Sequence, residues 1–130
     1  MMIRGIGVDV CEVSRMEKMN LESRFVERYF SEEERAYLTD KGVSFPQTLA
    51  GMYAAKEAFA KTLGSGVRGF ELNEIEVLHS VEGQPYYGVS GKALEAQKER
   101  KIERVFLSIS HEAGIAVAFA VGWGQDPSEE

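Results

Sequence analysis

The stretch from residue 49 to residue 66, LAGMYAAKEAFAKTLGSG, constrains the fold more than any other part of the chain. Its alanines favour a helix and allow other elements to approach the helix backbone closely. Glu57 and Lys61 stand four residues apart, so they share one face of that helix and can pair. An exposed pair of this kind is common and contributes only about 0.3 kcal/mol. The pattern predicts a close-packed helix with one charged face, and leaves the purpose of that face open.

Length and composition limit the classes of protein that the chain can belong to. At 130 residues it is expected to form one domain with its own core, and its net charge of -6 argues against general nucleic-acid binding. No apolar run is long enough to span a membrane, and an arginine and an aspartate interrupt the apolar N-terminus, which therefore lacks the layout of a signal peptide. A single cysteine, Cys11, excludes an internal disulfide. We therefore expect a cytoplasmic protein whose partners are neither nucleic acid nor membrane.

The alternation of residues 3 to 10 predicts a strand. Two valines and an isoleucine share one face of this strand, whereas its other face carries Gly5, Gly7 and Asp9. The glycines allow another element to approach the strand backbone. An aspartate is unfavourable within a strand, so Asp9 needs an explanation. Either the strand lies at the edge of a sheet with Asp9 facing water, or the carboxylate has a function.

The order of the predicted elements indicates a mixed fold. They are a strand at 3–10, helices at 13–29, 31–41 and 49–66, strands at 71–79 and 86–89, a helix at 91–101, and strands at 105–110 and 115–121. Ser31 and Glu34 form a capping-box pattern, and Pro46 marks a loop over residues 42–48. The last strand is apolar enough to be central. We predict an α+β fold with helices on one face of a mainly antiparallel sheet, as one domain over residues 1–124 with an acidic tail at 125–130.

Three ionisable residues lie in apolar or glycine-rich settings: Asp9, Glu57 and His111. The two carboxylates could converge on Mg²⁺, which is commonly held by one or two carboxylates together with water and substrate phosphates. One cysteine and two histidines offer no zinc-ligand spacing. A Ser-His-Asp arrangement is compatible with the residue counts, but no GxSxG motif is present. For His111 the alternative is a hydrogen-bonded structural histidine at the end of a strand.

The glycine-rich segment at residues 64–66, GSG, allows two interpretations. It could bind phosphate, but no Walker lysine follows it and it ends a helix instead of beginning one. The ordinary alternative is a helix C-cap. Composition and spacing therefore predict an α+β domain with a possible two-carboxylate metal site.

Four motifs, taken together, resemble a known family. They are GIGVDVCEVSR at 5–15, LAGMYAAKEAFAKTLGSG at 49–66, EGQPY at 82–86 and LSISHE at 107–112. In this order and spacing they resemble bacterial holo-[acyl-carrier-protein] synthase, the short type of 4′-phosphopantetheinyl transferase, over nearly the whole chain. The resemblance implies transfer of the phosphopantetheine arm of coenzyme A to a serine of an acyl carrier protein. It also implies release of adenosine 3′,5′-bisphosphate and a role in fatty acid biosynthesis.

The resemblance also implies which residues carry out the reaction. Asp9 and Glu57 would hold Mg²⁺, and Lys61 would contact the coenzyme A phosphates beside them, so that these three form the catalytic set. Attack of a hydroxyl on a pyrophosphate requires positioning and neutralised charge more than covalent help, which suits such a set. The serine proton would pass to Glu57 or to a metal-bound water.

Further residues would bind coenzyme A according to the same resemblance. In addition to Lys61, these are Gly64, Ser65, Gly66, Pro85 and His111. The chain departs from the family pattern at Met52, where many relatives have arginine, and at Gln84, where many have lysine. Both departures remove a positive charge near the phosphates of coenzyme A, and neither affects the metal pair.

The implied partners are a carrier protein and further copies of the chain. The short type forms homotrimers with active sites at subunit interfaces, and an acidic carrier protein binds the helix after the first strand. Arg15 matches the family arginine there, and Met19 and Arg24 would extend the contact. Two alternatives remain at this point: a non-catalytic α+β binding module with solvated carboxylates, or another magnesium-dependent phosphate-transfer enzyme.

Overall fold

The computed structural model describes residues 1–64, 69–126 and 128, which form two antiparallel sheets and a set of helices. One sheet has the strand order β1 (Met2–Glu12), β5 (Ile115–Gly124), β4 (Ile102–Glu112), and the other pairs β2 (Ile75–His79) with β3 (Pro85–Val89). The α-helices are α1 (Arg24–Tyr29), α2 (Glu32–Leu38), α3 (Phe45–Thr62) and α4 (Gly91–Glu99). Three short 3₁₀ helices are η1 (Val13–Met16), η2 (Gly42–Ser44) and η3 (Leu72–Glu74). The predicted α+β class is confirmed, and β5 is central as expected.

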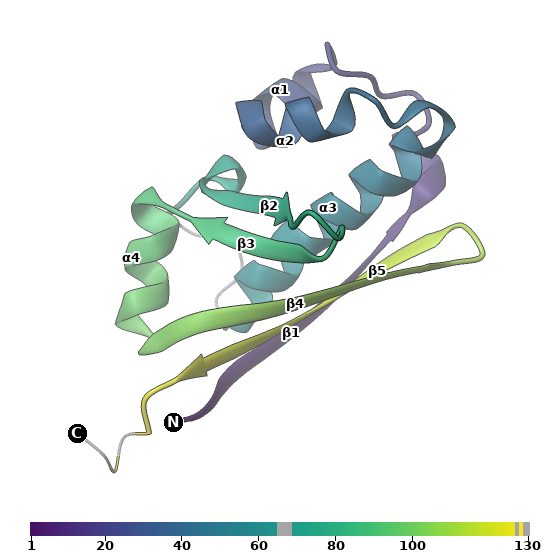
Figure 1. Cartoon of the computed structure of the whole chain (residues 1–130). Helices are drawn as coiled ribbons and strands as arrows, with labels where there is room; N and C mark the ends of the chain where they lie inside the picture. The colour runs from purple at the N-terminus through teal and green to yellow at the C-terminus, as the bar shows by residue number, and fades with distance from the viewer. Residues whose placement is uncertain (65–68, 127, 129–130) are drawn as a thin grey trace.

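Figure 1 shows that the helices and the β2–β3 hairpin lie on one side of the three-stranded sheet. Helix α3 crosses this side and packs on β1 and β5. The two sheets were expected as one. In the structure β3 runs near β4, but the strands of the two sheets do not pair with one another. Helix α3 therefore packs directly on the large sheet and also contacts η1, β2 and α2.

Helix α3 begins four residues earlier than predicted, at Phe45, and ends at Thr62. Pro46 lies in its first turn, where the missing N–H costs no hydrogen bond, so the predicted loop at 42–48 is wrong over its second half. Gly64 follows the helix with a φ of +81° and its N–H donates to the carbonyl oxygen of Lys61 at 2.9 Å. The C-cap interpretation is thus confirmed for Gly64. Ser65 and Gly66 lie outside the described residues.

The two glycines of β1 are the reason that α3 lies so close to the sheet. A Cβ atom at Gly5 would collide with the carbonyl oxygen of Thr62, and one at Gly7 with the carbonyl oxygen of Ala58. The expectation that another element approaches this face is therefore confirmed. The apolar face of β1 points the other way, and its valines Val8 and Val10 are 50% and 59% exposed.

The predicted helix at residues 13–29 is wrong. Only η1 and the six-residue α1 are helical in this region. Between them the Asn20 side chain accepts from the N–H of Glu22 at 2.8 Å, and the N–H of Asn20 donates to Ser23 Oγ at 2.9 Å. Such local side-chain bonds offer the backbone an alternative to the helical ladder. Periodic apolar residues were therefore present without a continuous helix.

Other boundaries differ by less. The capping box at Ser31 is present, and α2 ends at Leu38 instead of residue 41. Strand β2 begins at Ile75, because η3 occupies the start of the predicted strand at 71–79. Strand β4 extends beyond its predicted limits at both ends, and β5 extends beyond its predicted C-terminal limit. A tight turn at Ala113 and Gly114, both with positive φ, joins the two strands.

A buried ion pair joins α2, α3 and β2. The side chains of Lys56 and Glu34 are fully buried, with Lys56 Nζ 2.8 Å from Glu34 Oε1. Lys56 Nζ also donates to the carbonyl oxygens of Leu72 and Ile75, and the second oxygen of Glu34 accepts from the N–H of Val77. Burial lowers the pKa of Lys56, and the charge of Glu34 opposes this shift. The Lys56 ammonium thus has a hydrogen-bond acceptor for each of its three N–H groups, and the pair fixes the rotation of α3 relative to α2 and β2.

Replacement of Gly7 by alanine tests the close approach of α3. Gly7→Ala is expected to lower the free energy of unfolding by about 3 kcal/mol, because the new methyl group would press on a backbone carbonyl that cannot turn away. Gly88→Ala is the matched control, since there the nearest atom is the end of the Leu78 side chain. Chemical denaturation of both variants checks the difference. Equal stability of the two variants would contradict the packing described here.

Candidate active site

Asp9 lies on the inner face of β1, opposite α3. Lys61 Nζ donates to Asp9 Oδ1 at 3.0 Å and to the carbonyl oxygen of Val8 at 3.1 Å. The Asp9 side chain is 19% exposed and that of Lys61 is 52% exposed. β1 is an edge strand as one alternative supposed, but Asp9 does not simply face water. The strand instead presents its carboxylate to a cation from the helix.

Glu57 lies one helical turn before Lys61, and Tyr53 lies one turn before Glu57. Residues spaced in this way share one face of a helix. Burial raises the pKa of the Tyr53 phenol, and the charge of Glu57 together with hydrogen bonding to it raises that pKa further. Tyr53, Glu57 and Lys61 therefore share one face of α3, and Lys61 joins this face to Asp9 on β1; we call these four residues the polar strip.

The donor atoms at this strip fit a hard divalent cation. Asp9 and Glu57 supply carboxylate oxygens, the ligands that Mg²⁺ prefers. The Lys61 ammonium already lies at Asp9 Oδ1, so the position accommodates positive charge. Among the described residues, no three His, Cys, Asp or Glu side chains are grouped closely enough to hold a metal by themselves. A cation here would thus need ligands from water or substrate, as is usual for Mg²⁺.

The two other predicted coenzyme A contacts, Pro85 and His111, line one cavity of about 200 Å³. His111 Nε2 lies 3.0 Å from the carbonyl oxygen of Gln47, so the residue is hydrogen-bonded as its structural alternative expected. Its ring also lies against Gly51, where a Cβ atom would approach Nε2 to 2.9 Å. Met52, one of the departures from the family pattern, is fully buried beside this cavity. The structure thus brings Pro85 and His111 together.

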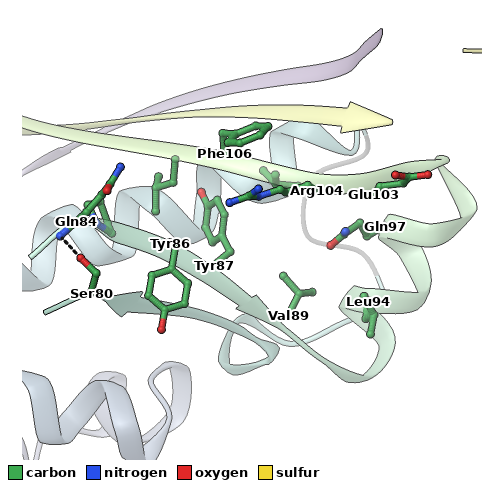
Figure 2. Close-up of a pocket in the computed structure, with 13 residues that line it drawn as sticks. Ser80, Gln84, Tyr86, Tyr87, Val89, Leu94, Gln97, Glu103, Arg104 and Phe106 are labelled. Carbon is green, nitrogen blue, oxygen red and sulfur yellow. Dashed lines mark hydrogen bonds between the residues drawn. The ribbon is translucent and has the colours of Figure 1, made fainter. Parts of the chain in front are cut away.

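A larger cavity of about 530 Å³ lies between β3, β4 and α4 (Figure 2). Pro85 lines both cavities, so they adjoin each other at the start of β3. Figure 2 shows Gln84, which directly precedes β3, and Arg104 on β4 among the residues that line it, with the N–H of Gln84 donating to Ser80 Oγ at 3.1 Å. Amide, hydroxyl and guanidinium groups line this cavity together with apolar side chains, and Gln84 is the position where the resemblance led us to expect lysine in many relatives.

Of the three residues expected to bind a carrier protein, Arg15 lies beside the polar strip. Arg15 is exposed on η1, and its guanidinium carbon lies 5.7 Å from the centroid of the Tyr53 ring. Arg24 is exposed on α1 next to Phe25, whose ring centroid is 5.3 Å from that of Tyr53. Met19 is partly buried and lines a groove of about 700 Å³. Arg15 thus lies at the Tyr53 ring, Arg24 precedes the phenylalanine that packs on that ring, and Met19 lines a separate groove.

Sequence reasoning missed two residues of this region. Tyr53 could have been found, because the spacing 53, 57, 61 continues one helix face. His79 carried no local signal. Its ring stacks on Tyr37 at 3.9 Å between centroids and lines the same cavity as His111, and its buried Nδ1 has no hydrogen-bond partner in the part of the chain that the structure describes. Burial lowers the pKa of His79, and the nearby Lys41 lowers it further.

Comparisons with known proteins identify the family of this chain. The sequence model of the 4′-phosphopantetheinyl transferase superfamily matches residues 5–120. The chain therefore belongs to the 4′-phosphopantetheinyl transferase superfamily. Within it, the holo-[acyl-carrier-protein] synthase of Treponema denticola is 41% identical over 120 residues, which are 92% of this chain and 98% of that protein.

Solved structures show the same relationship. Holo-[acyl-carrier-protein] synthase from Neisseria meningitidis superposes with a TM-score of 0.83 at 34% identity, over 94% of this chain and 99% of that one. A holo-(acyl-carrier-protein) synthase from Bacillus anthracis, in complex with coenzyme A (3′,5′-ADP), gives a TM-score of 0.78 at 35% identity, over 96% and 100%. Within the described residues, no helix is both long enough and apolar enough to cross a membrane.

The buried environment of His79 predicts a pH dependence of stability. Because its pKa is lowered in the folded state, the unfolded chain binds more protons below the ordinary histidine pKa of about 6.5, and the free energy of unfolding should fall as pH falls through that value. His79→Phe keeps an aromatic ring on Tyr37 and removes the titration, so the fall between about pH 7 and about pH 5.5 should become smaller. Denaturation at a series of pH values measures both slopes, and equal slopes would contradict the prediction.

Proposed function

We propose that this chain transfers the 4′-phosphopantetheine group of coenzyme A to a serine hydroxyl of an apo acyl carrier protein, with Mg²⁺ as cofactor. The observation that carries this proposal is the match to holo-[acyl-carrier-protein] synthases over nearly the full length of both chains. One such relative was solved with coenzyme A (3′,5′-ADP). The polar strip of Asp9, Glu57 and Lys61 supports the proposal from this chain's own residues.

The reaction forms one bond and breaks one. The serine oxygen attacks the phosphorus that carries pantetheine, the bridging P–O bond of the pyrophosphate breaks, and adenosine 3′,5′-bisphosphate leaves with the electron pair. Glu57 is the proposed acceptor of the serine proton. Asp9 and Glu57 would hold Mg²⁺, which supplies Lewis-acid charge neutralisation to the pyrophosphate when bound.

Lys61 has a second place to act besides its pair with Asp9. Its side chain is half-exposed, so the ammonium can leave Asp9 for a phosphate oxygen without disturbing the core. There it stabilises the negative charge that gathers on the leaving phosphate. The ion pair seen in the structure is then the resting arrangement of a phosphate contact.

The two cavities near Pro85 are the proposed sites for the rest of coenzyme A. His111 lies against Gly51 on α3, and Glu57 follows six residues later, roughly 9 Å along the helix axis. A long donor molecule can span that distance. Gly64, just after the C-terminal end of α3, is also a proposed contact, made through its backbone. A side chain at this position would meet Arg100. We propose Ser65 and Gly66 as contacts from the sequence alone.

An acidic carrier protein is the proposed acceptor, docked on Arg15, Met19 and Arg24. The net charge of the chain is -6, so a local basic surface has to steer the encounter. Arg15 provides exposed charge at the Tyr53 ring, one helical turn from Glu57, and Arg24 adds exposed charge on α1, whose Phe25 packs on Tyr53. A serine brought to this surface lies close to the proposed proton acceptor.

A homotrimer is the proposed assembly, and the outer face of the large sheet is its proposed contact surface. This face carries apolar side chains from all three strands: Ile6, Val8, Val10, Phe106, Phe119 and Trp123, each 36% to 61% exposed. Within the described residues no element covers it (Figure 1). An apolar patch of this extent usually marks a protein interface. Coenzyme A would then lie between subunits, with each copy completing its neighbour's site.

The decisive experiment is mass spectrometry of an apo carrier protein incubated with coenzyme A, Mg²⁺ and this chain. A gain of one phosphopantetheine mass is expected. Asp9→Asn and Glu57→Gln keep side-chain shape and remove charge, so each should lower the rate at least about a hundredfold while leaving the fold intact. The exposed Asp40→Asn and Glu95→Gln are matched controls with unchanged rates.

Three results would count against the proposal. No mass gain with several carrier proteins would favour a non-catalytic binding module. Mass gain only with another phosphate donor or acceptor would favour a different magnesium-dependent enzyme. Near-normal turnover of either carboxylate variant would contradict the assignment of Asp9 and Glu57 as Mg²⁺ ligands, although the transfer activity itself would stand.

The trimer is tested by placing a charge on the outer face. Val8→Lys is expected to convert the trimer to monomer in analytical ultracentrifugation, because it would place an ammonium group in an apolar interface. Val81→Lys is the matched control, since Val81 lies fully exposed in the turn after β2. A monomeric parent chain, or a trimer that Val8→Lys leaves intact, would show that this face is not the interface.

A further inference from the structure

Where α3 crosses β1 and β5, the sheet offers glycines and alanines. On β1 the contact is made by Gly5 and Gly7, which meet the carbonyl oxygens of Thr62 and Ala58. The fully buried positions of β5 are all alanines: Ala116, Ala118 and Ala120. Packed helices are normally held in place by side-chain ridges that fit into grooves. A surface of hydrogen atoms and methyl groups lets α3 come close, but it does little to fix the rotation of the helix about its own axis.

Lys56 holds α3 from a different side. Its Nζ lies 2.8 Å from Glu34 Oε1 on α2, and it donates to the carbonyl oxygens of Leu72 at 3.0 Å and of Ile75 at 2.7 Å. The other carboxylate oxygen of Glu34 accepts from the N–H of Val77 at 3.0 Å. An ammonium group has three N–H donors, and here the three acceptors come from α2, η3 and β2. All three bonds are made only when α3 is turned so that Lys56 faces them.

The rotation of α3 matters because the residues of the polar strip lie at the ends of side chains. Side chains end about 5 to 6 Å from a helix axis, so a rotation by about 10° moves the Glu57 carboxylate by about 1 Å. Lys61 lies on the same face and moves with it, away from its 3.0 Å contact with Asp9 Oδ1. A displacement of about 1 Å at a reacting group can lower a rate about a hundredfold.

We propose that Lys56 and Glu34 are positioning residues for the transfer reaction. Their buried pair sets the rotation of α3, and this rotation holds the Glu57 carboxylate and the Lys61 ammonium against β1. The inference rests on the proposed function. Both side chains of the pair are fully buried, so the pair acts on the site only through the helix. Because a buried ion pair adds little net stability, its removal should affect the reaction more than the fold.

A double variant, Lys56→Met with Glu34→Gln, removes both charges and leaves neither of them buried alone. Methionine keeps most of the length of the lysine side chain, and glutamine can still form the capping box with Ser31. The carbonyl oxygens of Leu72 and Ile75 lose their donor, so the melting temperature should fall. At temperatures well below the melting transition, kcat should be at least about tenfold lower than in the parent. KM for the carrier protein should change little, because the proposed docking residues lie before α2.

Ser31→Ala is the matched control. Ser31 Oγ accepts from the N–H of Glu34 at 3.3 Å and donates to Glu76, so its loss destabilises the start of the same helix, α2. The three acceptors of the Lys56 ammonium all remain. The control should therefore have a lower melting temperature and an unchanged kcat. A kcat that fell equally in the control and in the double variant would show that loosening α2 is enough, and would overturn the role of the pair.

Mn²⁺ binding distinguishes positioning from a purely structural role. Mn²⁺ is titrated by calorimetry into the parent, the double variant and Ser31→Ala, each with and without coenzyme A. The double variant should bind Mn²⁺ about tenfold more weakly, a loss of the size seen when a group that orients a metal ligand is removed. Ser31→Ala should bind Mn²⁺ like the parent.

Glu34→Gln alone covers the case in which the double variant does not fold. It keeps one oxygen for Lys56 but turns an amide NH₂ group toward the N–H of Val77, so the contact has to shift. Its kcat and its Mn²⁺ affinity should each be about threefold lower than those of Ser31→Ala, the effect of a weakened hydrogen bond. Values equal to those of the control would overturn the positioning role.

The outcomes distinguish this inference from the proposed function. An active parent whose double variant matches Ser31→Ala in kcat and in Mn²⁺ affinity would overturn the positioning role and leave the transferase proposal intact. A parent that modifies no carrier protein would overturn the proposed function, and with it this inference. A parent that binds no Mn²⁺, even with coenzyme A, would also overturn the inference, since Glu57 would then not belong to a cation site.

Discussion

Helix α3 meets β1 through its backbone, because two carbonyl groups of the helix lie where the strand has Gly5 and Gly7. With any larger residue at these positions the helix would have to move outward. The next inward-facing residue of the strand is Asp9, which then comes within 3.0 Å of Lys61 at the same contact. The candidate active site thus depends on a packing distance that only glycine allows.

The rotation of α3 about its axis matters as much as its distance from the strand. Successive helix residues point about 100° apart, so Lys56 and Glu57 cannot face the same way. Lys56 is held inward by Glu34 and by two backbone carbonyl groups. A buried pair of this kind contributes little net stability, because desolvation offsets the attraction. Its consequence here is orientation, since it leaves Glu57 on the side of the helix that carries Tyr53 and Lys61.

The sequence predicted the parts of this arrangement that depend on neighbouring residues. The alternation of glycine with apolar residues indicated a strand that another element approaches, and the spacing of Glu57 and Lys61 indicated one helix face. Contacts between distant segments were not predictable. No residue near Lys56 in the sequence indicates that its partner is Glu34. The capping box with Ser31 already accounted for that glutamate, so it gave no reason to look for a distant partner. The helix expected at 13–29 failed because Asn20 bonds its own backbone neighbourhood more favourably than a helix would.

The alternation in β1 also has a consequence for the opposite face of the sheet. A strand with glycines on one side and valines on the other would ordinarily bury the valines. Here the glycine side is buried instead, because the backbone of α3 packs directly on it, and the valines remain exposed. The same pattern that brings Asp9 to α3 therefore leaves an apolar face that none of the described helices and strands covers. The position of the site and the exposure of this apolar face have one origin in the strand.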